Sequence, residues 1–379
     1  MKIIVSPNAL KGCLSARSAA IAMQIGIERA KNNVNIHLKP VADGGDGFAE
    51  ILADAQGLHK KNISVCGPLE ESISTVIYFS ENKSVSVIET ATIVGLSLVP
   101  AEKRNPLLTT TSGIGQAIRI ALDEGAKHII LGLGGSATND AGMGMATALG
   151  VRFLDKNDKP VKPVGASLLD VSAIDTCNID YRLADVRIDV AGDVQNFLYG
   201  EKGAAYGFAQ QKGATTEQVR FLDEGLRQFS KVLSESSPRD NCDFPGAGAA
   251  GGLAVALKVF CGANIYRGID IVLEAIDFNS ALKNADLVLT TEGQLDAQTN
   301  AGKAPAGVAE RAYLNNIPCI VIAGSVPVDF ETIGQSNFSA ALSLCPGPIS
   351  LTDSIKNAYD YLSYTTEQVV RIFIAGRKF

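Results

Sequence analysis

The sequence predicts an α/β fold in which parallel strands have helices on both faces. Short apolar runs of strand length alternate with segments whose apolar residues recur every three or four positions, as they do on helices. Several strand runs are apolar throughout, which is typical of strands that are covered on both faces. The chain has 379 residues and can therefore form two such domains, each with its own core.

The first part of the chain begins this alternation. Residues 3–5 predict a strand, and Ser15 can cap a helix whose apolar positions continue to Ala30. A second strand is expected over residues 34–38, where apolar and polar residues alternate. A glycine-rich segment with two aspartates follows, and then a helix over residues 48–55.

The last part of the chain repeats the pattern. Continuous apolar runs predict strands over residues 286–290, 317–322 and 338–344. Pro305 suits the first turn of a helix, and a long helix is expected from about Leu351. Both ends of the chain therefore read as parts of one parallel-sheet domain.

The middle of the chain is different, because it begins with a hairpin. Residues 74–79 and 84–88 predict its two strands, and a further strand is expected over residues 186–190. This change of pattern indicates a second domain that is inserted into the first.

We therefore expect two domains. The first is a Rossmann- or flavodoxin-like domain, built discontinuously from residues 1–70 and 283–379. The second is an inserted α/β domain over residues 71–282, which carries the main glycine-rich loop.

Composition excludes several classes of protein. The formal net charge is −6 and no Lys/Arg patch is visible, so a nucleic-acid partner is not expected. No apolar run approaches the ~20 residues of a membrane span, and the N-terminal segment does not resemble a signal peptide. The seven cysteines are scattered and odd in number, as in a cytoplasmic protein with free thiols. The sequence leaves open whether the chain forms a homodimer.

The glycine-rich segment 132–140 is the strongest chemical signal. An apolar run over residues 128–131 leads into it, and a helix pattern over 143–149 follows. A strand, a glycine turn and a helix start can present backbone N–H groups to an anion. We expect it to bind phosphate through Gly134, Gly135, Ser136, Thr138 and Asn139, with Asp140 as a metal contact.

The same segment also fits a looser pattern, that of dinucleotide-binding folds. Residues 132–137 match G-x-G-x-x-A, and a strand-like run over 151–154 ends at Asp155, about where a ribose-binding acid would lie. A nicotinamide-dependent dehydrogenase is therefore an alternative. Against it, Asn139 and Asp140 would lie beside the pyrophosphate, where a carboxylate repels it unless a cation intervenes.

Other polar loops follow predicted strands, where open α/β sheets bind their ligands. Phosphoryl transfer needs acids for Mg²⁺ and cations for phosphate oxygens. Carboxylates are available at Asp43, Asp193, Glu292 and Asp296, and cations at Lys11 and Lys303. The Walker A sequence, the protein-kinase motifs and the G-x-S-x-G elbow of hydrolases are all missing from the sequence.

Taken together, these motifs resemble those of the type I glycerate kinase family of bacteria, nearly from end to end. The segments that carry the resemblance are Ser6–Gly12, Val41–Gly47, Gly132–Gly142, Ala191–Val194, Pro245–Gly252, Glu292–Asp296 and Gly302–Pro305. The resemblance implies phosphorylation of D-glycerate with ATP and Mg²⁺, commonly to 2-phosphoglycerate. It also implies a Rossmann-like domain made from both chain ends and an inserted domain, with the active site between them.

On this basis each candidate residue has an expected role. The catalytic candidates are Asp193, Lys11 and Asp296. Asn8 and Lys303 join the glycine-rich segment as binders of substrate and phosphate. Asp43, Glu292 and Asp140 are the candidate metal ligands.

The sequence departs from the family pattern at four positions. Asn8 replaces the usual Asp, Gln116 the usual Glu, Thr291 the usual Gly and Gln294 the usual Arg. Loss of an arginine beside a phosphate removes a bidentate contact. These substitutions keep open a second alternative, a non-catalytic relative that binds nucleotide or hydroxy acid.

Overall fold

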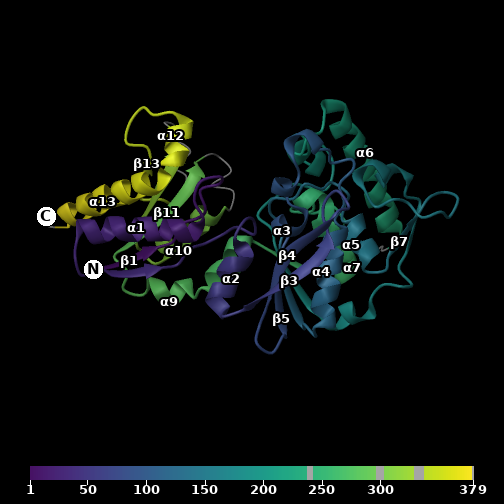
Figure 1. Cartoon of the computed structure of the whole chain (residues 1–379), viewed down its shortest axis with the longest axis horizontal. Coiled ribbons are helices and arrows are strands. Elements are labelled where there is room, and N and C mark those ends of the chain that lie inside the picture. The colour runs from purple at the N-terminus through teal and green to yellow at the C-terminus, as the bar shows by residue number, and fades with distance from the viewer. Residues whose placement is uncertain (237–241, 296–302, 328–336, 378–379) are drawn as a thin grey trace. The chain divides into compact units, whose positions relative to one another are not determined.

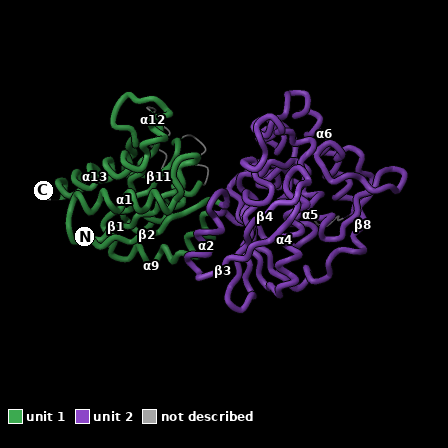
Figure 2. Tube along the Cα trace, viewed as in Figure 1, with its two compact units in different colours: residues 1–43, 269–379 green, residues 44–268 purple. Residues whose placement is uncertain are grey.

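The structure is a computed structural model that describes residues 1–236, 242–295, 303–327 and 337–377. The chain divides into two compact units, which Figure 2 colours separately. Unit 1 comprises residues 1–43 and 269–379, and unit 2 comprises residues 44–268. Both ends of the chain therefore belong to unit 1.

Unit 1 is built on a five-stranded parallel sheet with the order β13-β12-β11-β1-β2 (Figure 1). Its strands are β1 (Lys2–Val5), β2 (Asn35–Leu38), β11 (Leu287–Gln294), β12 (Cys319–Ser325) and β13 (Ala340–Ser343). Counted in chain order, this is the 2-1-3-4-5 arrangement of flavodoxin-like folds. The switch point, where such sheets bind ligands, therefore lies between β1 and β11.

Helices cover both faces of this sheet. Ile3, Ile4 and Val5 are all fully buried, although successive side chains of a strand point to opposite faces. α1 (Ala16–Ala30) packs along α13 (Ala358–Gly376), and α10 (Ala304–Leu314) packs on β11 and β12. The other helices with residues in unit 1 are α8 (Gly268–Ala275), α9 (Phe278–Leu282) and α12 (Leu351–Lys356).

Unit 2 is built on a mixed six-stranded sheet with the order β10-β9-β6-β5-β4-β3. The strands β5, β6, β9 and β10 run parallel, whereas β3 and β4 form an antiparallel hairpin beside them. The strands of unit 2 are β3 (His59–Cys66), β4 (Ser72–Phe79), β5 (Val85–Glu89), β6 (His128–Gly132), β9 (Arg187–Ala191) and β10 (Asn264–Tyr266), with β7 (Arg152–Leu154) and β8 (Ala173–Asp175) paired separately.

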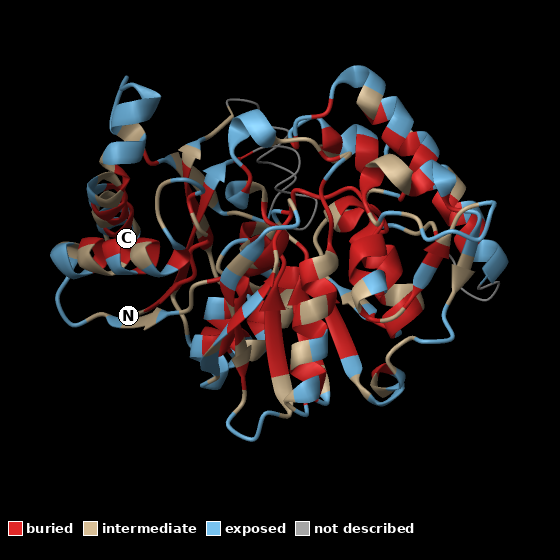
Figure 3. Cartoon of the chain, turned by 45° about the vertical axis from the view of Figure 1, so that its right-hand side comes forward, coloured by how far each residue is buried: buried red, intermediate tan, exposed pale blue. Residues whose placement is uncertain are grey.

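The helices of unit 2 complete its layers. They are α2 (Phe48–Gln56), α3 (Ala91–Val94), α4 (Ser112–Asp123), α5 (Met143–Ala148), α6 (Thr216–Ser236) and α7 (Leu253–Cys261). α5 packs against both α4 and α7, while α2 packs on β4 and β5. Figure 3 shows buried residues in red along the sheet strands and the inward sides of these helices. No helix in the described ranges is long and apolar enough to cross a membrane.

The boundaries of the two units differ from the expected ones at residues 70 and 283. β3 pairs along its full length with β4, and α2 packs on the same sheet, so residues 44–70 belong to unit 2. At the other boundary, residues 269–282 belong to unit 1. There, Gly307 of α10 packs closely against Ile269 of α8. Strand pairing and helix packing therefore set both boundaries.

The long helix expected from about Leu351 is in fact two helices. α12 ends before Asn357, whose backbone φ of −107° and ψ of 15° interrupt the helix, and α13 begins at Ala358. The Asn357 N–H donates to Asp353 O at 3.0 Å and ends α12. The side-chain amide of Asn357 also donates to Asp353 O, at 2.9 Å, so this residue caps α12 with both its backbone and its side chain.

The contact between α1 and α13 depends on one glycine. A Cβ atom added to Gly26 would lie 2.2 Å from the backbone oxygen of Ser363 and 2.9 Å from the Cβ of Thr366. No side chain fits there without moving one helix, so Gly26 sets the distance between the two helices.

We predict that Gly26→Ala lowers the free energy of unfolding by about 2 kcal/mol, because overpacking at this contact outweighs the better helix propensity of alanine. The melting temperature measured by circular dichroism checks this. Gly376→Ala is the matched control, because Gly376 is also helical, in α13, but has open space around it. Equal effects of the two substitutions would contradict a close-packed contact at Gly26.

Candidate functional site

The switch point of unit 1 holds a buried carboxylate. Glu292 lies near the end of β11 and is 8% exposed. Its Oε2 atom has no hydrogen-bond partner among the described residues. Burial raises the pKa of Glu292 to about 7; Lys303 and Lys11 act to lower the pKa, and Asp43 acts to raise it. Four of the predicted site residues therefore form one electrostatic group, which we call the Glu292 cluster.

Two threonines hold the neighbouring segment in place. The hydroxyl of Thr290 donates to Ser6 O, and that of Thr291 donates to Asn8 O, each at 2.7 Å. Asn8 is 7% exposed, and its Oδ1 accepts from the N–H of Ala9 at 2.9 Å. Thr291, which departs from the family pattern, thus fixes the segment that follows β1 against β11.

The Glu292 cluster fits a magnesium ion. Mg²⁺ needs only one or two carboxylates when waters and phosphate oxygens complete its shell. Glu292 offers a buried oxygen to which no described residue donates, and Asp43 lies close enough to raise the pKa of Glu292. Asp296, expected as a catalytic residue, lies outside the described residues. Within the described ranges, no group of three or more His, Cys, Asp or Glu side chains could hold a metal by itself.

In unit 2, the glycine-rich segment 132–140, which we call the glycine loop, packs backbone to backbone against residues 44–45. Gly134 N donates to Gly44 O at 2.9 Å. A Cβ atom on Gly134 would lie 2.2 Å from the Cα of Gly45, so only glycine permits this contact. Gly135 has a φ of +72°. The two glycine motifs are about 90 residues apart in sequence but are in direct backbone contact.

Asp140 has a structural position rather than that of the expected metal contact. It is fully buried, and its Oδ2 accepts hydrogen bonds from the N–H and hydroxyl of Thr111 and from Gly144 N. Its Oδ1 accepts from Gly142 N. With both oxygens engaged and no solvent exposure, the carboxylate joins the start of α4 to the start of α5.

The rest of the glycine loop has polar groups without partners. Thr138 and Asn139 are fully buried, and neither the Thr138 hydroxyl nor either atom of the Asn139 side-chain amide has a hydrogen-bond partner among the described residues. Ser136 is 6% exposed, and its hydroxyl accepts from the Nζ of Lys212 at 3.1 Å. Unsatisfied buried polar groups are rare, so their concentration here distinguishes this part of the loop, and its expected phosphate-binding role stays a prediction.

Asp193 follows β9, as expected, but one of its oxygens is already engaged. Its Oδ1 accepts from Gly268 N at 2.8 Å, at the start of α8. The structure therefore gives Asp193 a fixed position at the carboxyl end of β9, and its catalytic role stays a prediction.

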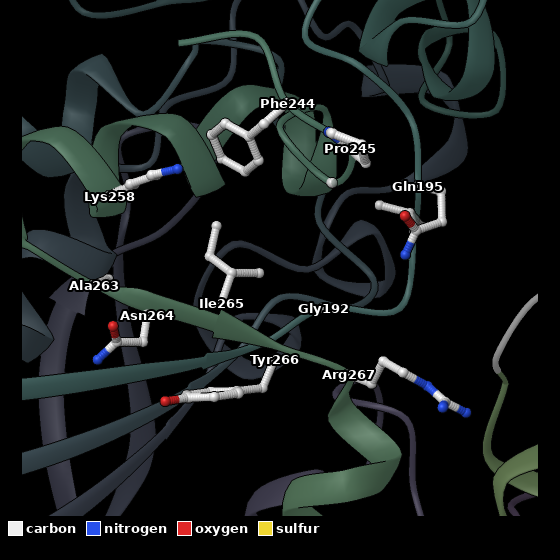
Figure 4. Close-up of a pocket in the computed structure, with 12 residues that line it drawn as sticks. Gly192, Gln195, Phe244, Pro245, Lys258, Ala263, Asn264, Ile265, Tyr266 and Arg267 are labelled. Carbon is white, nitrogen blue, oxygen red and sulfur yellow. The ribbon is translucent and has the colours of Figure 1, made fainter. Parts of the chain in front are cut away.

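A pocket of about 440 Å³ lies beside the edge strand β10 in unit 2 (Figure 4). Phe244 and Ile265 supply apolar surface, and Gln195 supplies an amide. The Nζ of Lys258 lies 4.1 Å from the centre of the Phe244 ring. A pocket of this size whose lining combines apolar side chains with several polar and charged ones can hold a small organic molecule. The sequence alone did not predict it.

Sequence reasoning missed two further residues, Lys212 and Glu89. Glu89 is the last residue of β5. It could have been found from the sequence, because polar residues at the carboxyl ends of strands are candidates for ligand binding in open α/β sheets. It is 4% exposed and accepts from Gly47 N at 3.2 Å and Ala49 N at 2.9 Å, at the start of α2. No local pattern distinguishes Lys212 from the other lysines of the chain.

The dinucleotide-binding alternative depends on the strand-like run at residues 151–154 and on Asp155, and the structure places both. The run at 152–154 is strand β7, which pairs antiparallel with β8 and does not join the main sheet beside β6. Asp155 accepts hydrogen bonds from the N–H groups of Asn157 and Lys159 and so closes a turn. The dinucleotide-binding reading is therefore wrong, because it requires a parallel neighbouring strand that ends in a ribose-binding acid.

Gln116, another departure from the family pattern, forms a hydrogen bond with the backbone of β3. Its Oε1 accepts from Cys66 N at 2.7 Å and so ties α4 to the end of β3.

A flavodoxin-like sheet with acids at its switch point is typical of an α/β phosphotransferase. So is a glycine loop whose Thr138 hydroxyl and Asn139 amide have no partner among the described residues. A sequence model described as the glycerate kinase family matches residues 3–374. The chain belongs to this family and is a kinase.

Individual relatives are similar to this chain over nearly its whole length. The glycerate kinase of Halalkalibacterium halodurans is 42% identical over 97% of both chains. The glycerate 2-kinase of Escherichia coli is 38% identical and matches 100% of this chain and 99% of its own. The crystal structure of a Salmonella typhimurium LT2 protein described as glycerate kinase 2 matches with a TM-score of 0.84 at 38% identity, covering 100% of both chains.

We predict that the contribution of Glu89 to the free energy of unfolding falls as the pH rises. Burial raises the pKa of Glu89 from 4.5 to about 7, with a smaller contribution from Asp46. Because the folded pKa exceeds the unfolded one, the stability that protonated Glu89 contributes is complete below about pH 4.5 and is lost as the pH rises through about 7. The stability of wild type relative to Glu89→Gln should therefore fall by about 3 kcal/mol across this range.

Urea unfolding of both proteins at about pH 5, 6, 7 and 8 measures this difference. The control is Glu81→Gln, which removes an exposed carboxylate from the turn between β4 and β5. The difference in free energy of unfolding between Glu81→Gln and wild type should be the same at each pH. Parallel curves for Glu89→Gln and wild type would contradict the prediction.

Proposed function

We propose that this kinase transfers the γ-phosphoryl group of ATP to D-glycerate, with Mg²⁺, to form 2-phosphoglycerate in the cytoplasm. The observation that carries the proposal is a buried oxygen of Glu292, which has no hydrogen-bond partner in the described part of the chain. It lies at the switch point of a flavodoxin-like sheet and within the electrostatic range of two lysines. The family and the printed functions of the relatives support glycerate as the substrate. None of the seven cysteines, all of which lie in the described ranges, forms a disulfide, and this supports a reducing compartment.

The chain's residues supply the parts that phosphoryl transfer needs. Asp43 and Glu292 would hold Mg²⁺, which neutralises phosphate charge when bound. Lys11 and Lys303 add positive charge for phosphate oxygens and for the carboxylate of glycerate. Asp193 and Asp296 are the candidates to accept the proton of the attacking hydroxyl. That oxygen then bonds to the γ-phosphorus as the bond to the β-phosphate oxygen breaks and ADP leaves.

Unit 2 has the features that a nucleotide requires. The glycine loop, with Ser136, Thr138 and Asn139, offers donors to the phosphates. The pocket beside β10 can take the adenosine group, since β6, β9 and β10 are consecutive neighbours in the sheet. Strands two apart are separated by ~10 Å, which is comparable to the distance from a nucleoside to its terminal phosphates.

We predict that the purified protein converts ATP and D-glycerate to ADP and 2-phosphoglycerate only when a divalent cation is present. Proton-coupled phosphorus NMR identifies the product, because phosphorus at the 2-position couples to one neighbouring proton and at the 3-position to two. L-Glycerate and lactate are the matched substrate controls. Metal-independent turnover, or nucleotide binding without turnover of any short hydroxy acid, would overturn the proposal; the second outcome would favour the non-catalytic alternative.

We further predict that Asp193→Asn lowers turnover at least ~100-fold, because a group that acts on the transferred proton stabilises the transition state most. The fold should survive, since an asparagine Oδ1 can still accept from Gly268 N. Asp189→Asn, the same change within β9, is the control and should leave turnover within about threefold. Near-normal turnover of Asp193→Asn would remove Asp193 from the catalytic group.

A further inference from the structure

Lys212 is buried directly behind the glycine loop of unit 2. It is 4% exposed, which is unusual for a lysine. Its Nζ donates to the Ser136 hydroxyl at 3.1 Å and to Thr138 O at 2.7 Å. The lysine follows a short π-helical turn at residues 205–209, a backbone irregularity that is frequent at functional sites.

The position of Lys212 carries an electrostatic cost. Burial lowers the pKa of Lys212 to about 8, while Asp140, the carboxylate within electrostatic range, acts to raise the pKa. Asp140 already accepts four hydrogen bonds from Thr111, Gly142 and Gly144. Replacing a buried charge by a well-packed apolar side chain is often neutral or stabilising, so stability alone does not explain the lysine.

The hydrogen bonds of Lys212 determine what Ser136 can do. An ammonium group only donates, so the Ser136 oxygen must accept from it. The hydroxyl proton of Ser136 then points away from Lys212 and can donate to another group. Beside it, the Thr138 hydroxyl and the Asn139 amide are buried without partners among the described residues. This part of the loop therefore contains hydroxyl and amide groups that can donate hydrogen bonds.

We propose that Lys212 is a positioning residue for phosphoryl transfer, which fixes the Ser136 hydroxyl as a donor and places a positive charge behind the loop that holds the nucleotide's phosphates. The proposal rests on the proposed function, because it assigns those phosphates to the glycine loop. Charge that is preorganised in a water-excluded site stabilises a developing phosphate charge more than the same charge in water does.

The first test is Lys212→Met, which keeps the length and apolar stem of the side chain but removes the charge. We expect kcat to fall roughly 100-fold, as when one preorganised donor is removed, with a melting temperature equal to or above that of wild type. Lys202→Met, the same substitution at an exposed position ten residues earlier, should match wild type in both measurements. Wild-type kcat in Lys212→Met would overturn the proposal.

The second test asks whether Lys212 acts through Ser136. Ser136→Ala should lower kcat by a similar factor, and Lys212→Met/Ser136→Ala should be little worse than either single variant, because both remove the same oriented donor. Losses that multiply in the double variant would show that the lysine does not act through this hydroxyl.

The third test separates charge from packing. Lys212→Ala leaves a space that ethylammonium can enter, and this ion should restore a large part of the lost kcat. Ethanol, which has a similar size but no charge, should not do so. Equal rescue by both, or rescue by neither, would indicate a packing role and overturn the proposal.

Binding measurements distinguish failure of this inference from failure of the proposed function. If wild type does not phosphorylate glycerate, the proposed function fails. Calorimetric titration of wild type and Lys212→Met with Mg²⁺–ATP then tests the lysine by itself. The inference predicts at least tenfold weaker binding to the variant. Equal binding would overturn it.

Discussion

The parallel pairing of β1 with β11 is the constraint on which unit 1 depends. It aligns Ile3 with Leu287, and the backbone N–H of Lys2 donates to Asp286, 284 positions further along the chain. Closing such a long loop has a high entropic cost, which continuous burial of both strands offsets. Once the strands pair, their carboxyl ends lie at the same sheet edge, so the segment after β1 meets the end of β11. The Glu292 cluster exists because of this pairing.

Unit 2 has a comparable constraint in the contact between its two glycine segments. Here backbone packs on backbone, and Gly134 N donates to Gly44 O. Glu89, at the end of β5, accepts further hydrogen bonds from Gly47 N and Ala49 N. The loop that we assign to phosphates is therefore held by main-chain contacts. Within the described ranges, the Thr138 hydroxyl and the Asn139 amide take no part in holding it. Asp140 also holds this loop, because its carboxylate accepts from Thr111 N at the start of α4 and from Gly144 N at the start of α5.

Buried ionisable groups concentrate at these two places. Glu89 and Glu292 both have a pKa raised to about 7, and Lys212 has one lowered to about 8, with burial as the first cause in each case. Each shift means that the folded protein disfavours the charged form, so each group costs stability at neutral pH. Natural proteins retain such groups where function needs charge in a dry environment.

The sequence by itself determined the α/β class, most strands and helices, the capping of α1 by Ser15 and the family resemblance, because these depend on local periodicity and on short motifs. It also predicted that loops after parallel strands gather acids and lysines at one sheet edge, with Asp43, Asp193, Glu292, Asp296, Lys11 and Lys303 as the candidates. Only the tertiary structure decided the boundaries of the two units, the break at Asn357, the structural role of Asp140 and the positions of Glu89 and Lys212. The burial and partners of a side chain depend on segments far away in sequence, and no local pattern contains that information.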